Sequence, residues 1–551
     1  MWYIQMCFRD TDYNQVSMNV KLSFLTERQQ RFLDKSWAKL FSERVFPLIN
    51  AARFEVLYCK DNGRPNAPVR QIIGALLLKE LTQVTDEELL ECVILDPRYQ
   101  YALHLTGFDE IPFSDRTVSR FRERLYHHEV ETGEDLLKAE IEGLSAEFAK
   151  MLKIHGTLKR MDSVMISSSC KNMGRLELIY TCVANLVKAL VKSGESGILP
   201  DYLLKYAESS NKNSVCYRLK DGEVRTRLEE VTAHALELYK LAEYARGGED
   251  EFQLLERMLK DQTENGTLKQ NKDISPDSLQ NPSDEDATFR RKAGKGYHGF
   301  TGNIVEDCGE EGNIITHYDY DVNIHSDVAF GAEVIEELGP QEETTVLITD
   351  GAYPSEENFE AAKDSNIEFV PTALTGQEPP EILNEFEIED QTILTCPGGH
   401  APDDCTYNEE KGQYRAYFNK GTCEGCPRRD ECPAILQKKS AVVTLSQTGV
   451  QRAAYLKMLA SENYREYARK RNGVEGIPSI LRRRYGVDHM PVRGLVRSKM
   501  WFGFKIGAIN IKRVIKAALS SLQIGTFSEL SDMILFEMDF FEFSFGFPCA
   551  A

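Results

Sequence analysis

The run Val346 to Gly351 (VLITDG) constrains the fold of this chain more than any other stretch. Apolar, β-prone residues that end in a carboxylate and a glycine are typical of a buried strand followed by a turn. In an α/β sheet the residues just beyond the strands carry the chemistry, so Asp350 is a candidate functional residue. A strand that merely stops at an Asp-Gly turn gives the same pattern. Asp350 therefore needs partners elsewhere in the chain.

A second carboxylate lies inside a strand-like run, residues 158–167 (LKRMDSVMIS). Burying an unpaired carboxylate costs on the order of several kcal/mol, so Asp162 is expected to have a hydrogen-bond partner, a cation or an exposed face. An aspartate on the open face of the strand is the alternative interpretation. Asp162 is the second candidate.

The third candidate acid, Glu475, lies in a basic segment. If Arg471, Glu475 and Arg482 are on one helix, their spacing places all three side chains on one face. Two glycines and a proline in this segment weaken a continuous helix. Glu466 is the alternative third acid, and a surface Arg-Glu pair is the alternative interpretation of the spacing.

Helical patterns dominate the N-terminal part of the chain. Residues 67–82 carry apolar residues at helical spacing, and the following Thr85-Asp86-Glu87-Glu88 is typical of a helix start. A further helix is expected to open at Ser114, with Arg116 and Arg120 on a basic stripe. This stripe is either a solvated face or a phosphate-contacting face.

Helical patterns return between residues 175 and 260, and residues 265–287 have the composition of a flexible linker. Two strands joined by a glycine-rich turn at 309–312 are expected next. A basic cluster precedes the first of them, which indicates a charged loop or a contact with a DNA backbone. Its members are Arg290, Arg291, Lys292 and Lys295.

Several motifs, taken in order, resemble bacterial insertion-sequence transposases. GRPNAPV, TDEELLE and IPFSDRTVSRFRERL, within residues 40–126, resemble their helical N-terminal domain, and MDSVMISS, NPSDEDATFRRKAGKGYHGF and LITDGAYPS resemble the DDE catalytic domain. The spacing Arg471-x3-Glu475-x6-Arg482 also resembles the basic, acidic, basic signature of these transposases, and this match is the reason for choosing Glu475. The resemblance implies a ribonuclease H-like fold in which Asp162, Asp350 and Glu475 hold Mg2+ or Mn2+. It also implies that the N-terminal domain binds the element's terminal DNA, with Arg471 and Arg482 holding phosphates near the site.

The expected architecture is an α/β catalytic core, a ribonuclease H-like mixed sheet with helical and cysteine-rich insertions, preceded by an all-helical N-terminal domain. At 551 residues the chain should form several domains. The expected divisions are a DNA-binding domain at 1–150, the first part of the core at 151–370 with a helical insert at 175–285, an acidic and cysteine-rich insertion at 371–458, the rest of the core at 459–525, and an apolar acidic tail at 526–551.

The cysteine-rich insertion predicts a zinc site. Of the 13 cysteines, five fall between Cys396 and Cys432, and this crowding suggests a metal rather than disulfides in a cytosolic chain. The expected ligands of a closed, structural zinc site are Cys396, Cys423, Cys426 and Cys432. Cys405 and His400 are alternatives to Cys396. Cysteines kept reduced and unliganded would give the same pattern.

The charge distribution is uneven. A net charge of −20 argues against a protein coated in basic charge, but residues 471–513 are strongly basic and can hold phosphates. The expected DNA contacts in this segment are Arg471, Arg482, Arg483, Arg484, Arg493 and Lys499. No membrane span or secretory signal is apparent, so we expect a cytoplasmic, nucleoid-associated protein.

The sequence therefore predicts a DDE transposase that binds double-stranded DNA at the element's terminal repeats and at the target, as a homodimer, and that catalyses metal-dependent strand cleavage and strand transfer. Two further hypotheses use the same residues. One is an inactive, transposase-derived DNA-binding protein, and the other is a metal-dependent nuclease without strand transfer.

Overall fold

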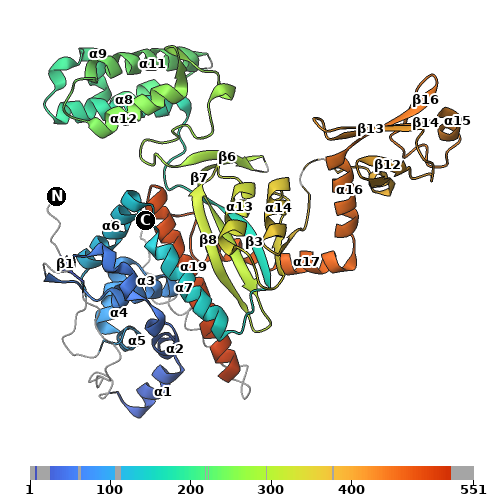
Figure 1. Ribbon diagram of the computed structural model, residues 1–551. Helices are drawn as coiled ribbons and strands as arrows, with labels where there is room; N and C mark the ends of the chain where they lie inside the picture. Colours follow the sequence, from blue (N-terminus) through green and yellow to red (C-terminus); the bar gives the residue numbers. More distant parts are fainter. Residues whose placement is uncertain are drawn as a thin grey trace. The chain divides into compact units, whose positions relative to one another are not determined.

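The computed structural model describes residues 6–8, 25–59, 64–105, 113–217, 219–220, 222–292, 294–374, 376 and 378–522 (Figure 1). The chain divides into two compact units that are interleaved along the sequence. The first contains the described parts of 1–156, 163–326 and 478–551, and the second contains 157–162 and 327–477. The expected tail at 526–551 lies outside the described residues, and the expected domain boundaries stay predictions.

The N-terminal part of the first unit is helical, as predicted. The helix expected over 67–82 is α3 (Val69–Thr82), and Thr85 caps the next helix in a reciprocal capping box with Glu88. Short strands β1 (Met6–Cys7) and β2 (Arg64–Pro65) pair in parallel. The other helices are α1 (Glu27–Lys35), α2 (Trp37–Arg44), α4 (Asp86–Leu95), α5 (Pro97–Ala102), α6 (Asp115–Thr132) and α7 (Leu136–Met151).

The C-terminal helix α19 (Leu495–Leu522) packs against α3, α7 and strand β8 (Asn313–Val322) in the first unit. Its aromatic residue Phe502 is fully buried, so this part of the helix belongs to the core. Gly507 allows close packing, because a Cβ there would lie 2.7 Å from Leu77 Cδ2 and 2.8 Å from Ile141 Cδ1. Helix α19 is therefore a central element of this unit.

Strand β7 (Lys295–Cys308) pairs antiparallel with β8 from Phe300–Val322 to Cys308–Asn313, which confirms the hairpin predicted around the glycine-rich turn. A second hairpin was not predicted. Strand β6 (Thr288–Lys292) also pairs antiparallel with β7, so the basic cluster lies on two paired strands instead of a loop that precedes one strand.

The helical insert has a hydrophobic core of its own, formed mainly by α8, α11 and α12. Its helices are α8 (Arg175–Lys192), α9 (Asp201–Leu204), α10 (Ser209–Cys216), α11 (Glu223–Ala242) and α12 (Glu249–Gln262), followed by the strands β4 (Thr263–Glu264) and β5 (Thr267–Leu268). The expectation of a flexible linker at 265–287 is wrong for its last part. Asp284 is buried there and accepts hydrogen bonds from Ser168 Oγ and from Gly494 N, the latter at 3.0 Å.

The second unit contains parallel strands. β9 (Thr345–Thr349) lies between β10 (Ile367–Pro371) and the first half of β3 (Leu158–Ser167), and it is parallel to both. Helices α13 (Asp327–Leu338) and α14 (Glu356–Asp364) pack on each other, and α14 packs on β10. The two strands predicted here, one with Asp162 and one before Asp350, are confirmed, because buried apolar runs and clear turn residues mark their ends.

Strand β3 also belongs to the first unit, where Thr301 Oγ1 of β7 donates to Val164 O. The strand order is β10-β9-β3-β7-β6, with β8 paired to β7, which makes the sheet mixed. A mixed sheet with helices is consistent with the predicted α/β core and helical N-terminal region. The ribonuclease H-like fold stays a prediction.

A cysteine-rich module follows β10 within the second unit. Its four-stranded sheet has the order β13-β14-β16-β15, and a separate pair of strands, β11 and β12, precedes it. The elements are β11 (Glu387–Glu389), β12 (Thr392–Thr395), β13 (Asp404–Asn408), β14 (Gln413–Asn419), α15 (Lys420–Glu424), β15 (Ile435–Leu436) and β16 (Ser440–Ser446). Helices α16 (Gln447–Leu459), α17 (Glu462–Asn472) and α18 (Gly476–Arg483) lead to α19. Among the described residues, no helix has the length and apolar character needed to cross a membrane.

Candidate active site

Asp350 follows directly after β9, an interior strand of the sheet. The strand is held by buried side chains, with Leu347, Ile348 and Thr349 fully buried. The Asp350 carboxylate is oriented by its own turn, because the Ala352 N–H donates to Asp350 Oδ1 at 2.8 Å. Its side chain is 28% exposed, so one part of it remains open to solvent.

The strand register places Asp162 level with Asp350. Arg160 of β3 is paired with Ile348 of β9, and the two strands are parallel. Asp162 and Asp350 each lie two residues beyond this pair, so the two carboxylates leave neighbouring strands at the same height of the sheet. Asp162 is more enclosed, with 14% of its side chain exposed.

Arg471 contacts all three acids that the sequence analysis singled out. Its Nη2 lies 3.5 Å from Asp162 Oδ1 and 4.0 Å from Asp350 Oδ2, and its Nη1 donates to Glu475 Oε1 at 2.9 Å. The two aspartate oxygens are therefore no farther apart than the sum of the first two distances. Only 14% of the Arg471 side chain is exposed. Its positive charge therefore offsets the negative charges of the carboxylates where water screens them little.

The expectation that Arg471, Glu475 and Arg482 share one helix is wrong. Arg471 is near the end of α17, Glu475 lies between α17 and α18, and Arg482 is on α18. Glycine and proline have low helix propensity, and this segment with two glycines and a proline forms two separate helices, α17 and α18. The buried side chains of Val474 and Ile477 hold the connection, while Glu475 remains 55% exposed.

Arg160 is a supporting residue that the sequence analysis missed. This buried side chain of β3 donates from Nη1 to Lys470 O at 2.5 Å. A Cβ at Gly473 would lie 2.1 Å from the same Nη1, so only glycine allows this approach. Arg160 thereby ties the segment that carries Arg471 to the strand that carries Asp162. The sequence signal that could have identified Arg160 is a basic residue inside an apolar, strand-like run.

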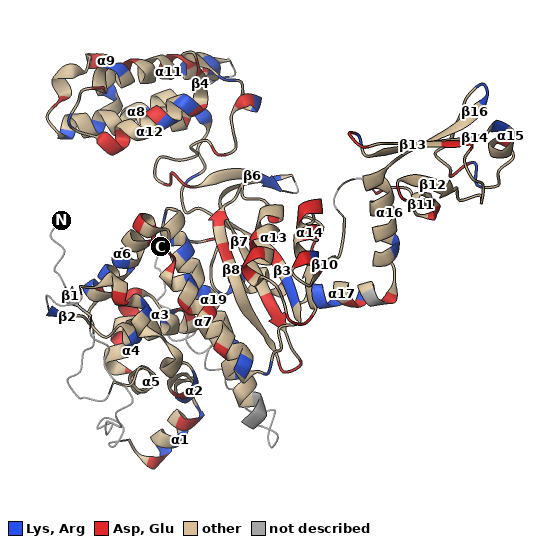
Figure 2. Cartoon of the chain, viewed as in Figure 1, with Lys and Arg blue, Asp and Glu red and all other residues tan. Residues whose placement is uncertain are grey.

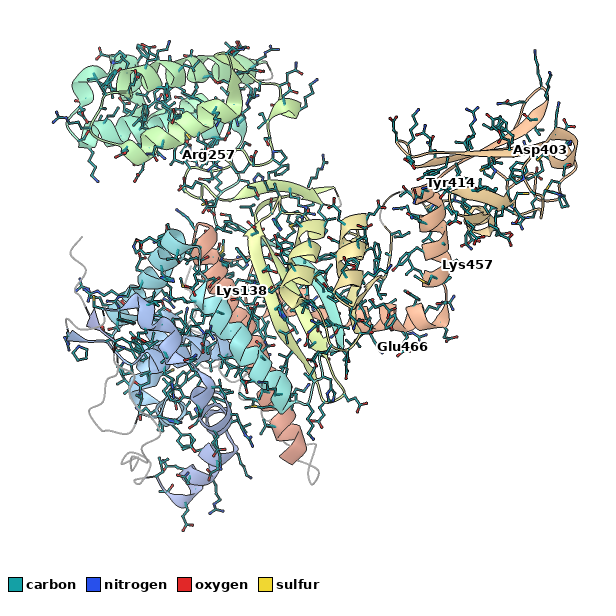
Figure 3. All side chains as sticks on the ribbon, in the orientation of Figure 1. Lys138, Arg257, Asp403, Tyr414, Lys457 and Glu466 are labelled. Atoms are coloured by element: carbon teal, nitrogen blue, oxygen red, sulfur yellow. The ribbon has the colours of Figure 1, made fainter. Side chains whose placement is uncertain are left out.

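The alternative third acid, Glu466, lies on α17 (Figure 3). It pairs with a lysine of its own helix and not with Arg471. Its Oε1 is 2.9 Å from Lys470 Nζ one turn later, and the side chain is 62% exposed. The hydrogen bond from Lys470 lowers the pKa of Glu466. Glu466 thus forms a surface pair, whereas Glu475 shares Arg471 with the two aspartates.

Lys and Arg occur along the chain among Asp and Glu (Figure 2). The residues expected to contact DNA differ in their exposure. Exposed positions are held by Arg116, Arg120, Arg291, Lys292, Lys295, Arg482, Arg483 and Arg493, whereas Arg290 and Arg484 are half-buried. Arg290 Nη1 donates to His325 O at 3.1 Å, and Arg482 Nη2 donates to Met165 O at 3.0 Å. The fixed backbone partners of these two arginines favour a structural role.

Lys499 is turned into the protein. Its Nζ pairs with Glu129 Oε1 and lies 3.4 Å from Asp135 Oδ2, and only 21% of the side chain is exposed. Lys499 therefore forms ion pairs between helices of the first unit. The expectation that it contacts a DNA phosphate does not agree with this position. Other basic residues of α19 have similar partners, including Lys505 with Glu80 at 2.7 Å.

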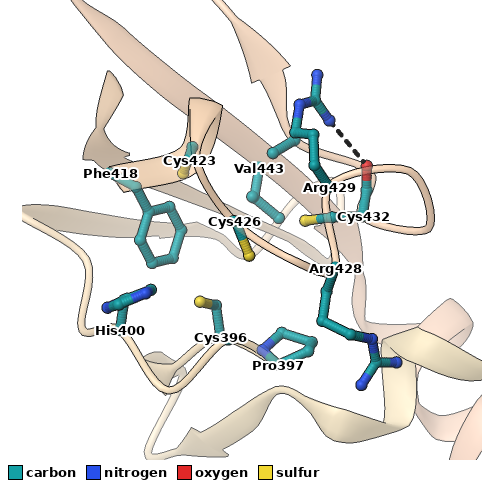
Figure 4. Close-up of a pocket in the computed structure, with 12 residues that line it drawn as sticks. Cys396, Pro397, His400, Phe418, Cys423, Cys426, Arg428, Arg429, Cys432 and Val443 are labelled. Carbon is teal, nitrogen blue, oxygen red and sulfur yellow. Dashed lines mark hydrogen bonds between the residues drawn. The ribbon is translucent and has the colours of Figure 1, made fainter. Parts of the chain in front are cut away.

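The cysteines expected to bind zinc surround one small pocket in the cysteine-rich module (Figure 4). Cys396, Cys423, Cys426 and Cys432 line it together with His400, whereas Cys405 lies on β13 and does not. Across the part of the chain that the structure describes, no group of three or more His, Cys, Asp or Glu is already arranged to hold a metal ion.

The fold and the site define an α/β protein with carboxylates gathered at the ends of parallel strands, a class that serves many chemistries. The comparisons with known families are more specific. A model described as a transposase DDE domain matches residues 395–515, and one described as a transposase domain (DUF772) matches residues 28–124. The two matches together indicate an insertion-sequence DDE transposase. No match was found among curated proteins or among solved structures.

The two matches cover different parts of the site. The transposase domain match includes α1 to α5 and most of α6, and the DDE domain match includes the cysteine-rich module, Arg471 and Glu475 but neither Asp162 nor Asp350. A transposase role is supported by both. The family implies a DNA substrate and typically uses a divalent metal.

Proposed function

We propose that this chain binds the ends of its insertion sequence as double-stranded DNA and catalyses metal-dependent strand cleavage and strand transfer, with Asp162, Asp350 and Glu475 as the catalytic acids. The observation that carries the proposal is the contact of one guanidinium, that of Arg471, with all three carboxylates. Three carboxylates from distant segments thus share one cationic partner. Among the described residues no three acids are already arranged to hold a metal ion, so metal binding requires these side chains to turn towards one another.

The donor set fits Mg2+ or Mn2+. Both prefer carboxylate and water oxygens, and the partial exposure of Asp350 and Glu475 leaves room for water and DNA. When bound, divalent ions would activate the attacking water or 3′-hydroxyl and stabilise the leaving oxygen. The chain's own contribution is positional: the Ala352 N–H fixes the Asp350 carboxylate, and Arg160 fixes the segment of Arg471.

Arg471 has a second role in this proposal. Its guanidinium offsets the mutual repulsion of the acids before metal and DNA arrive. It can then turn to a phosphate group and bind two of its oxygens bidentately. The exchange from carboxylate to phosphate keeps the arginine paired throughout. No covalent enzyme intermediate is needed, because positioning and charge supply the catalysis.

Binding of the element's ends is assigned to the exposed basic positions. These are Arg116 and Arg120 on α6, the tip of the β6–β7 hairpin, Arg483 at the end of α18 and Arg493 just before α19. Exposed Lys and Arg side chains that neutralise phosphates supply most of such affinity. We further propose that the chain acts as a homodimer on DNA, at the nucleoid in the cytoplasm.

The test uses a labelled duplex of the element's terminal sequence with Mg2+, measured for both binding and cleavage. Asp350→Ala should abolish cleavage and transfer and leave binding within about twofold, because the carboxylate holds metal and not phosphate. Glu466→Gln is the matched control, since Glu466 is an exposed acid of the same region without contact to Arg471. It should retain full cleavage.

Two outcomes would replace the proposal. Unmutated protein that binds the duplex tightly but never nicks or joins it, in Mg2+ or Mn2+, would leave an inactive DNA-binding protein. Protein that nicks the duplex but never joins a 3′-hydroxyl end to a target would leave a nuclease. Loss of cleavage in Glu466→Gln together with full activity of Glu475→Gln would move the third catalytic role to Glu466.

A further inference from the structure

The cysteine pocket of the second unit joins two chain segments that are far apart in sequence. The first is the turn that follows β12, with Cys396 and His400, and the second connects β14 to β15 and carries Cys423, Cys426 and Cys432. All four cysteines are free thiols. Four thiols from two loops around one small pocket are the donor set of a closed zinc site.

Backbone hydrogen bonds shape both segments into tight turns. In the first, the Gly399 N–H donates to Cys396 O at 2.7 Å and the Cys396 N–H donates to His400 O at 2.9 Å. In the second, the Arg429 N–H donates to Cys426 O at 3.1 Å and the Cys432 N–H donates to Arg428 O at 3.1 Å. These main-chain hydrogen bonds hold the cysteine backbones of both turns in place.

Gly398 shows how closely the two turns approach. A Cβ at this position would lie 3.1 Å from Cys426 Sγ and 3.7 Å from Cys396 Sγ. The backbone of the first turn thus passes directly over a sulfur of the second, and a larger side chain there would fill the space between them. The neighbouring Gly399 has a φ of +76°, a conformation that favours glycine.

The module also needs a link between these loops. Its hydrophobic core is small, and Cys396, Cys423 and Cys432 pack at its edge as partly buried residues. Small modules with few core residues are commonly held by a metal or by disulfides. Arg429 also lines the pocket, and its Nη1 donates to Cys432 O at 3.4 Å.

We propose that Cys396, Cys423, Cys426 and Cys432 bind one structural zinc ion as thiolates. The described side chains do not yet form a coordination sphere, so binding turns them about their Cα–Cβ bonds into the pocket while the two turns stay in place. Cys405 is not a ligand: it lies on β13, outside the pocket, and accepts a hydrogen bond from the Ile393 N–H at 3.4 Å. His400 lines the pocket beside the thiolates.

The zinc content is measured by elemental mass spectrometry. The sample is full-length protein purified under reducing conditions without chelators. We expect about one zinc per chain, and Cys426→Ser should remove at least half of it and lower the melting temperature of the module. Cys405→Ser is the matched control, a cysteine of the same module outside the pocket, and should keep the zinc. His400→Gln should also keep it.

A second readout does not depend on stability. Replacement of zinc by Co2+ in the unmutated protein should give strong thiolate-to-cobalt charge-transfer absorption and the visible bands of a tetrahedral site. Absence of both zinc and the cobalt spectrum in reduced protein would overturn the proposal. Loss of zinc in Cys405→Ser or His400→Gln, with retention in Cys426→Ser, would overturn the ligand set. Asp350→Ala should keep its zinc, so failure of the catalytic proposal leaves this one standing.

Discussion

Arg471 Nη2 lies 3.5 Å from Asp162 Oδ1, and the same nitrogen lies 4.0 Å from Asp350 Oδ2. One cationic group thus spans two carboxylates that leave neighbouring parallel strands at the same height of the sheet. Carboxylates so close repel each other unless a cation lies near them. The guanidinium and a metal ion are therefore competitors for the same oxygens.

This competition predicts the effect of Arg471→Gln. Removal of the guanidinium charge should tighten Mn2+ binding about threefold to tenfold, because the ion no longer displaces a bound cation from partly enclosed acids. Strand cleavage should fall, since the phosphate then lacks its partner. Mn2+ affinity is measured from the signal of free Mn2+ in electron paramagnetic resonance.

The matched control is Arg469→Gln, an exposed arginine two residues earlier on α17. It should leave Mn2+ affinity unchanged, because ion pairs at exposed positions are screened by water. Equal affinity in Arg471→Gln and the unmutated protein would contradict the idea that Arg471 competes with the metal.

Much of the second unit could be predicted from its sequence. The strand with Asp162 has the predicted ends, and the strand before Asp350 lies where its apolar run indicated. These elements combine a periodic or continuous apolar pattern with turn residues at both ends. Local signals of this kind are sufficient to predict a helix or strand and the residue that follows it.

Side-chain partners could not be predicted in the same way. Arg160 and Lys470 are 310 residues apart in the chain, and no local pattern pairs them. The basic segment was predicted from its charge alone, yet Lys499 faces carboxylates of α6 and of the residue before α7. The net charge of a segment does not tell which way each side chain points. That direction depends on which face of α19 is buried.

The hairpin of β6 and β7 is the first part of the DNA surface to test. Arg291 and Lys295 are exposed near its tip, so Arg291→Gln and Lys295→Gln should weaken binding of the terminal duplex. The slope of log affinity against log salt should flatten by roughly one unit for each lost phosphate contact. Melting temperatures should stay unchanged, and an unchanged salt slope in both variants would exclude this hairpin from the interface.

Lys499→Gln should behave in the opposite way. The substitution leaves Glu129 and Asp135 without their cation in a largely enclosed place. We expect a loss of about 2 kcal/mol in the free energy of unfolding, measured by chemical denaturation. Binding by the folded fraction should keep the salt slope of the unmutated protein. A flattened slope with full stability would restore Lys499 as a phosphate contact.

The last prediction concerns Lys512, on α19. Burial lowers the pKa of Lys512 to about 8, and the positive charges of Arg484 and Lys516 add to the effect. The folded state therefore holds the proton less tightly than the unfolded chain, whose lysine keeps its ordinary pKa of about 10.5. Below pH 8 both states are protonated and the full cost of the buried charge is present. Stability contributed by this residue then rises with pH between about 8 and 10.5.

Lys512→Met removes the charge and keeps the volume, so it should stabilise the protein at pH 7. Because the side chain is still partly exposed and water screens its charge, we expect about 1 kcal/mol rather than the full value of the pKa difference. The gain over the unmutated protein should shrink as the pH rises from 8 towards 10.5, since the folded protein then buries a neutral lysine while the unfolded chain still carries the charged one. Lys188→Met, at an exposed position of α8, is the control and should change stability little at either pH. Denaturation midpoints at pH 7 and pH 10 measure the effect, and a gain in Lys512→Met that is equal at both would show that packing, and not the charge of Lys512, is responsible.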